Sequence, residues 1–160
     1  MTTTAHDIAF PGLNGGSIAL KDYEGRAVLI VNVASACGFT PQYKDLQALW
    51  TARQGEGLTV IGVPSNDFGA QEPGSEAEIG VFCERNFGVS FPLTAKQRVI
   101  GPEAHPFYRW VTDTLGEDQA PRWNFHKYLV AKDGSIFGSF PSRVAPLSPD
   151  LTNAINTALA

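Results

Sequence analysis

The chain has 160 residues, enough for one domain with a buried core, and we expect a single domain over residues 1–160. The net charge is −4 and no basic stripe is present, which argues against a nucleic-acid partner. The apolar run from Ala27 to Val33 is too short to span a bilayer, and residues 1–10 lack a signal pattern. The sequence therefore predicts a cytoplasmic protein without stable membrane association.

The first predicted elements are a small hairpin and a buried strand. Residues 6–23 are typical of a hairpin, because Asn14-Gly15-Gly16 favours a turn between two short alternating segments. The strand follows at Val28–Val33, which is almost entirely apolar and rich in β-branched residues. This composition is typical of a strand that is buried on both faces in the middle of a sheet.

Cys37 follows that strand and precedes a helix predicted from Pro41 to Gln54. Thr40 supplies a capping hydroxyl, and Pro41 suits the first helical position. The positive end of a helix favours a thiolate over a thiol, so Cys37 is a candidate nucleophile. A small buried residue in a tight turn is the alternative interpretation.

A second buried strand is predicted over Leu58–Pro64, which completes a strand–helix–strand unit. The two strands should be parallel with a right-handed crossover, so their carboxyl ends meet at one edge of the sheet. Ligands bind outside that edge in open α/β sheets. The polar loop over residues 65–74 leaves the second strand there, and we expect it to face Cys37.

The next helix begins at Ser75-Glu76-Ala77-Glu78, which has the pattern of a capping box. The apolar spacing places Cys83 on its buried face. A small core residue is the alternative interpretation of this cysteine. Two cysteines in a cytosolic chain are more often reduced or redox-active than a structural disulfide, and no Cys/His cluster has metal-ligand spacing.

The remaining elements complete an α/β pattern. We expect a short strand at residues 91–93, a helix over 105–115, a hairpin formed by 128–131 and 135–140, and a last helix over 148–159. Strands, hairpin and helices in this order predict a mixed central sheet flanked by helices, which is a thioredoxin-like layout.

Four stretches together resemble the glutathione peroxidase family in its cysteine-containing form. They are residues 31–43 (VNVASACGFTPQY), 66–74 (NDFGAQEPG), 105–110 (HPFYRW) and 123–130 (WNFHKYLV). The similarity extends from about Ile8 to Leu159, and the order and spacing of the blocks make it far more specific than a single motif. It implies a thioredoxin-like fold and the reduction of hydrogen peroxide and organic or lipid hydroperoxides, without a metal or cofactor.

The resemblance also assigns roles to residues. It implies that Cys37 is the peroxidatic cysteine and that Gln71, Trp123 and Asn124 support it. Their amide and indole N–H groups are uncharged donors, which can stabilise a thiolate without repelling a neutral peroxide. Cys83 matches the resolving position of family members that use thioredoxin, which implies a Cys37–Cys83 disulfide that thioredoxin reduces.

Two departures from the family pattern matter. The loop that usually reads Pro-Cys-Asn-Gln-Phe-Gly has Ser65 and Asp67 in place of its cysteine and glutamine, whereas Gln71 is retained. The chain is short between His105 and Trp123, as in members that lack the long loop used for tetramer assembly, which implies a monomer. Glutathione as the reductant, and a peroxide sensor that passes its disulfide to a regulatory protein, remain alternatives.

Overall fold

The computed structural model describes residues 3–160. A central four-stranded sheet has the strand order β4-β3-β5-β6. β3 (Ala27–Val33) and β4 (Leu58–Pro64) are parallel, whereas β5 (Lys127–Val130) is antiparallel to β3 and β6 (Ile136–Phe140) is antiparallel to β5. The mixed sheet predicted from the sequence is confirmed.

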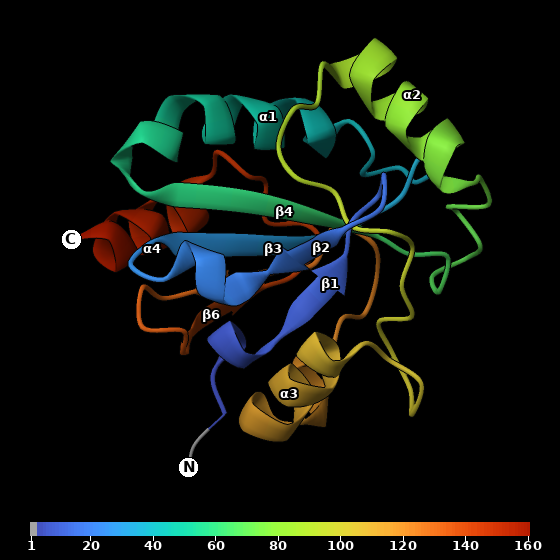
Figure 1. Cartoon of the computed structure of the whole chain (residues 1–160). Helices are drawn as coiled ribbons and strands as arrows, with labels where there is room; N and C mark the ends of the chain where they lie inside the picture. The colour runs from blue at the N-terminus through green and yellow to red at the C-terminus, as the bar shows by residue number, and fades with distance from the viewer. Residues whose placement is uncertain (1–2) are drawn as a thin grey trace.

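Helices cover both faces of this sheet (Figure 1). The α-helices are α1 (Gln42–Arg53), α2 (Glu76–Phe87), α3 (Pro106–Leu115) and α4 (Pro149–Leu159). A separate two-stranded hairpin is formed by β1 (Ala9–Pro11) and β2 (Ser17–Ala19). Short 3₁₀ turns occupy η1 (Ala5–Asp7), η2 (Leu20–Tyr23), η3 (Gln54–Glu56) and η4 (Glu117–Gln119).

The two faces of the sheet bury separate apolar cores. Successive residues of a strand point to opposite faces, so Leu29 and Val31 of β3 pack toward α1, α2 and α4, whereas Val28 and Ile30 pack toward α3 and the hairpin. Each fully buried Val, Leu or Ile contributes about 1.5–3 kcal/mol relative to an exposed one. A strand of this kind is stable only between two layers, which explains its central place.

The helix that carries Cys83 has well-defined ends. The Ser75 hydroxyl accepts a hydrogen bond from Glu78 N, and the Glu78 carboxylate accepts one from Ser75 N, which confirms the predicted capping box. Gly88 ends the helix with φ 60°, a left-handed conformation that favours glycine. Both Ile79 and Cys83 are buried on its inner face.

The strand expected at residues 91–93 is reduced to isolated bridges, from Leu93 to Gly62 and from Thr94 to Gly12. Pro92 explains part of this outcome, because it has no backbone N–H to donate. Its carbonyl accepts a hydrogen bond from Gly62 N at 3.0 Å, and beyond it the segment makes only separate backbone bonds to β4, from Thr94 N to Gly62 O and from Gln97 N to Pro64 O. Among the helices of residues 3–160, none combines the length and apolar character needed to cross a membrane.

Candidate active site

Cys37 lies in a tight turn between β3 and α1, at the carboxyl edge of the sheet as predicted. The Thr40 hydroxyl organises this turn: it accepts a hydrogen bond from Cys37 N at 2.9 Å and donates one to Ala34 O at 2.8 Å. The expectation that Thr40 caps the helix is therefore wrong, and Pro41 occupies the N-cap without a side-chain bond. The hydroxyl is already used within the turn, so it is not available to the helix.

Two N–H groups point at the Cys37 sulfur. Trp123 Nε1 and Phe39 N each donate to Sγ at 3.3 Å. Both donors are uncharged N–H groups, which can stabilise negative charge that develops on the sulfur without adding net charge to the site. The Cys37 residue is only 8% exposed, but the Trp123 side of the site is open, since Trp123 is 36% exposed. The Phe39 donor was missed from the sequence, because a backbone N–H leaves no residue-type signal.

Gln71 and Asn124 pair with each other, and the Gln71 carbonyl is held at the Cys37 turn by a hydrogen bond from Ala36 N at 3.0 Å. Asn124 Nδ2 donates to Gln71 Oε1 at 2.9 Å and to Phe68 O at 3.4 Å. Within residues 3–160, neither amide makes a hydrogen bond to Cys37, and Asn124 Oδ1 is buried without a partner. Of the three predicted supporting side chains, only that of Trp123 reaches Sγ directly in this structure.

Asn32 fixes the segment that carries Trp123 and Asn124. It is fully buried in β3, and its Nδ2 donates to Trp123 O at 3.0 Å while its Oδ1 accepts from His126 N at 3.1 Å. The backbone carbonyl of Asn32 accepts from Phe125 N at 2.6 Å. A polar residue within an otherwise apolar buried strand is the sequence signal that could have indicated this positioning role.

The backbone is unusual next to both amide side chains. Ala70, before Gln71, has φ 52°, and Phe125, after Asn124, has φ 65°, values that non-glycine residues rarely adopt. Gly69 has φ 68°, and a Cβ there would lie 3.1 Å from Cη2 of Trp123. Glycine at this position therefore allows the indole ring to approach the loop closely.

Asp67, which stands where the family loop usually has glutamine, anchors this loop. Its carboxylate accepts hydrogen bonds from Arg98 Nε and from Val99 N, both at 2.7 Å. These contacts tie the loop after β4 to the segment that begins at Arg98. The substituted loop is thus anchored and still presents Gln71 to the site.

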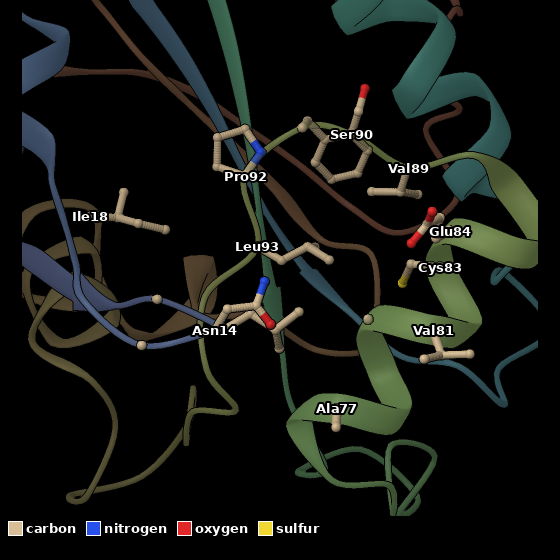
Figure 2. Close-up of a pocket in the computed structure, with 15 residues that line it drawn as sticks. Asn14, Ile18, Ala77, Val81, Cys83, Glu84, Val89, Ser90, Pro92 and Leu93 are labelled. Carbon is tan, nitrogen blue, oxygen red and sulfur yellow. The ribbon is translucent and has the colours of Figure 1, made fainter.

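Cys83 is buried on the inner face of α2, in the apolar core that also contains Cys37, and both cysteines are free thiols. It lines a cavity of about 640 Å³ between α2, the β1–β2 turn and residues 89–93 (Figure 2). Burial raises the pKa of Cys83 to about 11; the nearby Tyr43 hydroxyl opposes this increase, and the Glu72 carboxylate adds to it. Within residues 3–160, no group of three or more His, Cys, Asp or Glu could hold a metal ion.

A cysteine with N–H donors at the edge of a thioredoxin-like sheet defines the class as thiol oxidoreductases with this fold. The model of the family "Glutathione peroxidase" matches residues 5–112. The glutathione peroxidase-like peroxiredoxin GPX5 of Chlamydomonas reinhardtii is 45% identical over 148 residues, which cover 90% of this chain and 91% of the relative. The chain therefore belongs to the glutathione peroxidase family and is a peroxidase of that family, which confirms the resemblance.

Two further comparisons agree with this assignment. The hydroperoxy fatty acid reductase gpx1 of Synechocystis sp. is 44% identical over 151 residues, which cover 89% of each chain. The crystal structure of Trgpx in its apo form aligns with a TM-score of 0.78 at 32% identity, covering 99% of this chain and 97% of that one. The predicted fold class, a thioredoxin-like α/β fold, is confirmed.

Proposed function

We propose that the protein reduces hydroperoxides through a two-cysteine cycle that begins at Cys37. The thiolate attacks one peroxide oxygen, the O–O bond breaks, and the other oxygen leaves as water or alcohol after taking a proton. Cys37 becomes a sulfenic acid. The observation that carries this role is the pair of N–H donors, Trp123 Nε1 and Phe39 N, at 3.3 Å from Sγ.

The second half of the proposed cycle uses Cys83. Its sulfur attacks the Cys37 sulfenic acid, water leaves, and a Cys37–Cys83 disulfide forms. Thioredoxin then returns the disulfide to two thiols by exchange. The support is that the sequence contains just these two cysteines and that a relative at 45% identity is named a glutathione peroxidase-like peroxiredoxin.

The substrates proposed are hydrogen peroxide and organic hydroperoxides, including those of fatty acids. The partly exposed Trp123 and the half-buried Phe39 flank Cys37, so an apolar chain can lie against the surface beside the sulfur. The Synechocystis relative is named a hydroperoxy fatty acid reductase, which favours this substrate class.

Replacement of the nucleophile tests the first step. We expect Cys37→Ser to abolish peroxide reduction, because a serine hydroxyl is not ionised at neutral pH and is a hard, weak nucleophile. Single-turnover consumption of hydrogen peroxide, followed by stopped flow, is the measurement. A serine variant that retains even about a tenth of the rate would reject Cys37 as the nucleophile.

Replacement of Cys83 tests the second step separately. In Cys83→Ser we expect the first turnover to stay fast, since Cys37 and its donors are untouched, while thioredoxin-driven turnover falls sharply. Without a resolving thiol, excess peroxide should oxidise Cys37 to the sulfinic acid, which mass spectrometry detects. Full thioredoxin-dependent turnover in this variant would exclude Cys83 as the resolving residue. Slow thioredoxin turnover in the unmodified protein would favour the relay alternative.

A further inference from the structure

Lys127 is a buried cation that the cycle described so far does not use. Among residues 3–160 it is the only lysine or arginine that is buried as a whole residue, and its ammonium makes no ion pair within that range. Burial lowers the pKa of Lys127 to about 7. A cation that is removed from water without a carboxylate partner is unfavourable for stability, so this position calls for a functional reason.

The Lys127 ammonium binds the backbone of the segment that follows β6. Its Nζ donates to Ser142 O at 3.0 Å and to Val144 O at 2.6 Å. Hydrogen bonds from an ammonium are charge-assisted and stronger than those between neutral groups. The Lys127 backbone is itself held inside the sheet, because it pairs with Val31 of β3 and with Phe140 of β6. The side chain therefore fixes this segment relative to the sheet.

A series of hydrogen bonds leads from this ammonium to the Cys37 sulfur. Ser142 O, which accepts from Lys127, also accepts from Gln42 Nε2 at 2.9 Å. Gln42 is the first residue of α1, and its backbone N donates to Phe39 O at 2.8 Å. Phe39 N in turn donates to Cys37 Sγ at 3.3 Å. The buried cation and the sulfur are thus connected through one backbone carbonyl and two residues of the Cys37 turn and α1.

The cavity beside Phe39 shows that the two segments lie next to each other. Phe39, Pro141 and Ser142 all line a cavity of about 500 Å³. The Thr40 hydroxyl holds the first part of the turn, through Cys37 N. The position of Phe39 at the end of the turn depends in addition on what α1 contacts at its first residue, and that contact is Ser142 O.

We propose that Lys127 is a positioning residue for peroxide reduction, which keeps the backbone N–H of Phe39 aimed at the Cys37 sulfur. The inference rests on the role of Cys37 as nucleophile that is proposed above. Lys127 touches neither the sulfur nor the peroxide. It acts through Ser142 O and Gln42, which are the two intermediate contacts between its ammonium and Phe39.

This role gives the two N–H donors of the site a common support. Trp123 donates from the segment that leads into β5, whereas Phe39 donates from the turn before α1. Lys127 is the first residue of β5, so it belongs to the same stretch of chain as Trp123. A donor stabilises developing charge best when it is already in place before the reaction. Lys127 therefore ties the Phe39 donor to the strand that follows the Trp123 donor.

The variant Lys127→Met tests this role, because it removes the ammonium and keeps a long, unbranched side chain. Replacement of a buried charge by an apolar side chain is often neutral for stability, so we expect the variant to fold. At about pH 6, where Lys127 is protonated, the second-order rate constant with hydrogen peroxide should fall about tenfold, since Trp123 still donates to the sulfur. Lys132→Met is the matched control. Lys132 Nζ also donates to a backbone carbonyl, Leu159 O at 2.8 Å, but has no part in the series that reaches Cys37, so this variant should keep the unmodified rate.

The amide resonance of Phe39 gives a signature that a general loss of stability does not produce. In ¹H–¹⁵N spectra of the reduced protein, Lys127→Met should shift the Phe39 amide proton upfield, because its hydrogen bond to the sulfur weakens. The indole N–H of Trp123 should keep its position, because Asn32 holds that residue through its carbonyl. An unchanged Phe39 resonance, an equal shift of both resonances, or an unchanged peroxide rate in Lys127→Met would each overturn the proposal.

A second variant, Gln42→Met, interrupts the same series at its next contact and leaves Lys127 in place. It removes the Nε2 donor to Ser142 O and keeps the backbone N–H that binds Phe39 O, so it should also slow the peroxide step about tenfold. Because both substitutions break one series, the double variant should be within about twofold of either single variant. Effects that multiply in the double variant would show that Lys127 does not act through Gln42, and would overturn the proposal.

Failure of the proposed function would have a different result. If Cys37→Ser still reduces peroxide, the nucleophile and the positioning role are rejected together. If peroxide reduction depends on Cys37 but the Phe39 resonance does not move in Lys127→Met, only the role of Lys127 is rejected. The two failures are thus distinguishable, because the Phe39 resonance is measured without peroxide.

Discussion

Trp123 is the side chain whose chemistry the site depends on most directly. Its indole N–H is the sole side-chain donor to the Cys37 sulfur within residues 3–160, and its ring packs at 5.9 Å from Phe68. Phe39 N is a second donor, and it belongs to the backbone of the same turn. The indole can therefore be removed while one donor remains in place.

Trp123→Phe removes the N–H and keeps most of the aromatic packing. Loss of one donor to a developing charge typically slows a reaction by about 10²–10³-fold, and with the Phe39 donor retained we expect about tenfold. The second-order rate constant for the peroxide step, measured by stopped flow at fixed pH, is the relevant quantity. A rate equal to that of the unmodified protein would show that the indole N–H contributes nothing to the reaction.

At the scale of elements, we expect α2 to change when the two cysteines bond. Cys83 faces the core from α2, whereas Cys37 lies in the turn after β3, and a disulfide requires Cα atoms within about 7 Å. Only Ile79 and Cys83 of this helix are fully buried, with Phe82 and Phe87 partly buried. Gly88 at its end provides a residue that tolerates large backbone changes.

We therefore expect α2 to unwind partly when the disulfide forms. Hydrogen exchange on the reduced and oxidised proteins should show lower protection of residues 76–87 after oxidation, while residues 106–115 in α3 stay unchanged as the internal control. The disulfide is confirmed by mass spectrometry on the same samples. Equal protection of residues 76–87 in both states would contradict local unfolding.

At the scale of the whole molecule, the protonation of His126 makes the free energy of unfolding depend on pH. Its Nε2 lies 2.8 Å from Ser139 Oγ, and its ring lies 4.7 Å from that of Tyr128, so it joins the site segment to β5 and β6. Burial lowers the pKa of His126 to about 4, with smaller contributions from Lys127 and Arg122. An unfolded histidine titrates near 6.5, so the unfolded chain binds more protons between about pH 6.5 and pH 4.

The sign of this coupling is that stability rises with pH across that window. The contribution of neutral, buried His126 to the free energy of unfolding should be complete above about pH 6.5. Up to ~3 kcal/mol of it should be lost as the pH falls to 4. Urea unfolding of the unmodified protein and of His126→Gln at several pH values measures this effect. The free energy of unfolding of the unmodified protein, relative to that of the variant, should decrease as the pH falls below 7. A constant difference from pH 7 to 4 would refute the coupling.

The sequence by itself determined the elements and their layers. The apolar runs of β3 and β4, the capping box at Ser75 and the hairpin formed by β5 and β6 depend on neighbouring residues, so local patterns predict them. The strand–helix–strand order then placed Cys37 at the carboxyl edge of the sheet, because parallel strands share that edge. The four family blocks led to the correct family for the same reason: their order and spacing are properties of the chain alone.

Only the tertiary structure decided which groups meet at the sulfur. Trp123 lies 86 positions from Cys37, and its contact depends on Asn32 and on the positive φ of Phe125. Gln71 and Asn124 lie in two different loops, and the packing of these loops brings the two amide side chains within hydrogen-bond distance. A hydrogen bond forms or fails within a few tenths of an ångström. Contacts between segments that are distant in sequence are therefore decided by how the layers pack, which local sequence patterns do not encode.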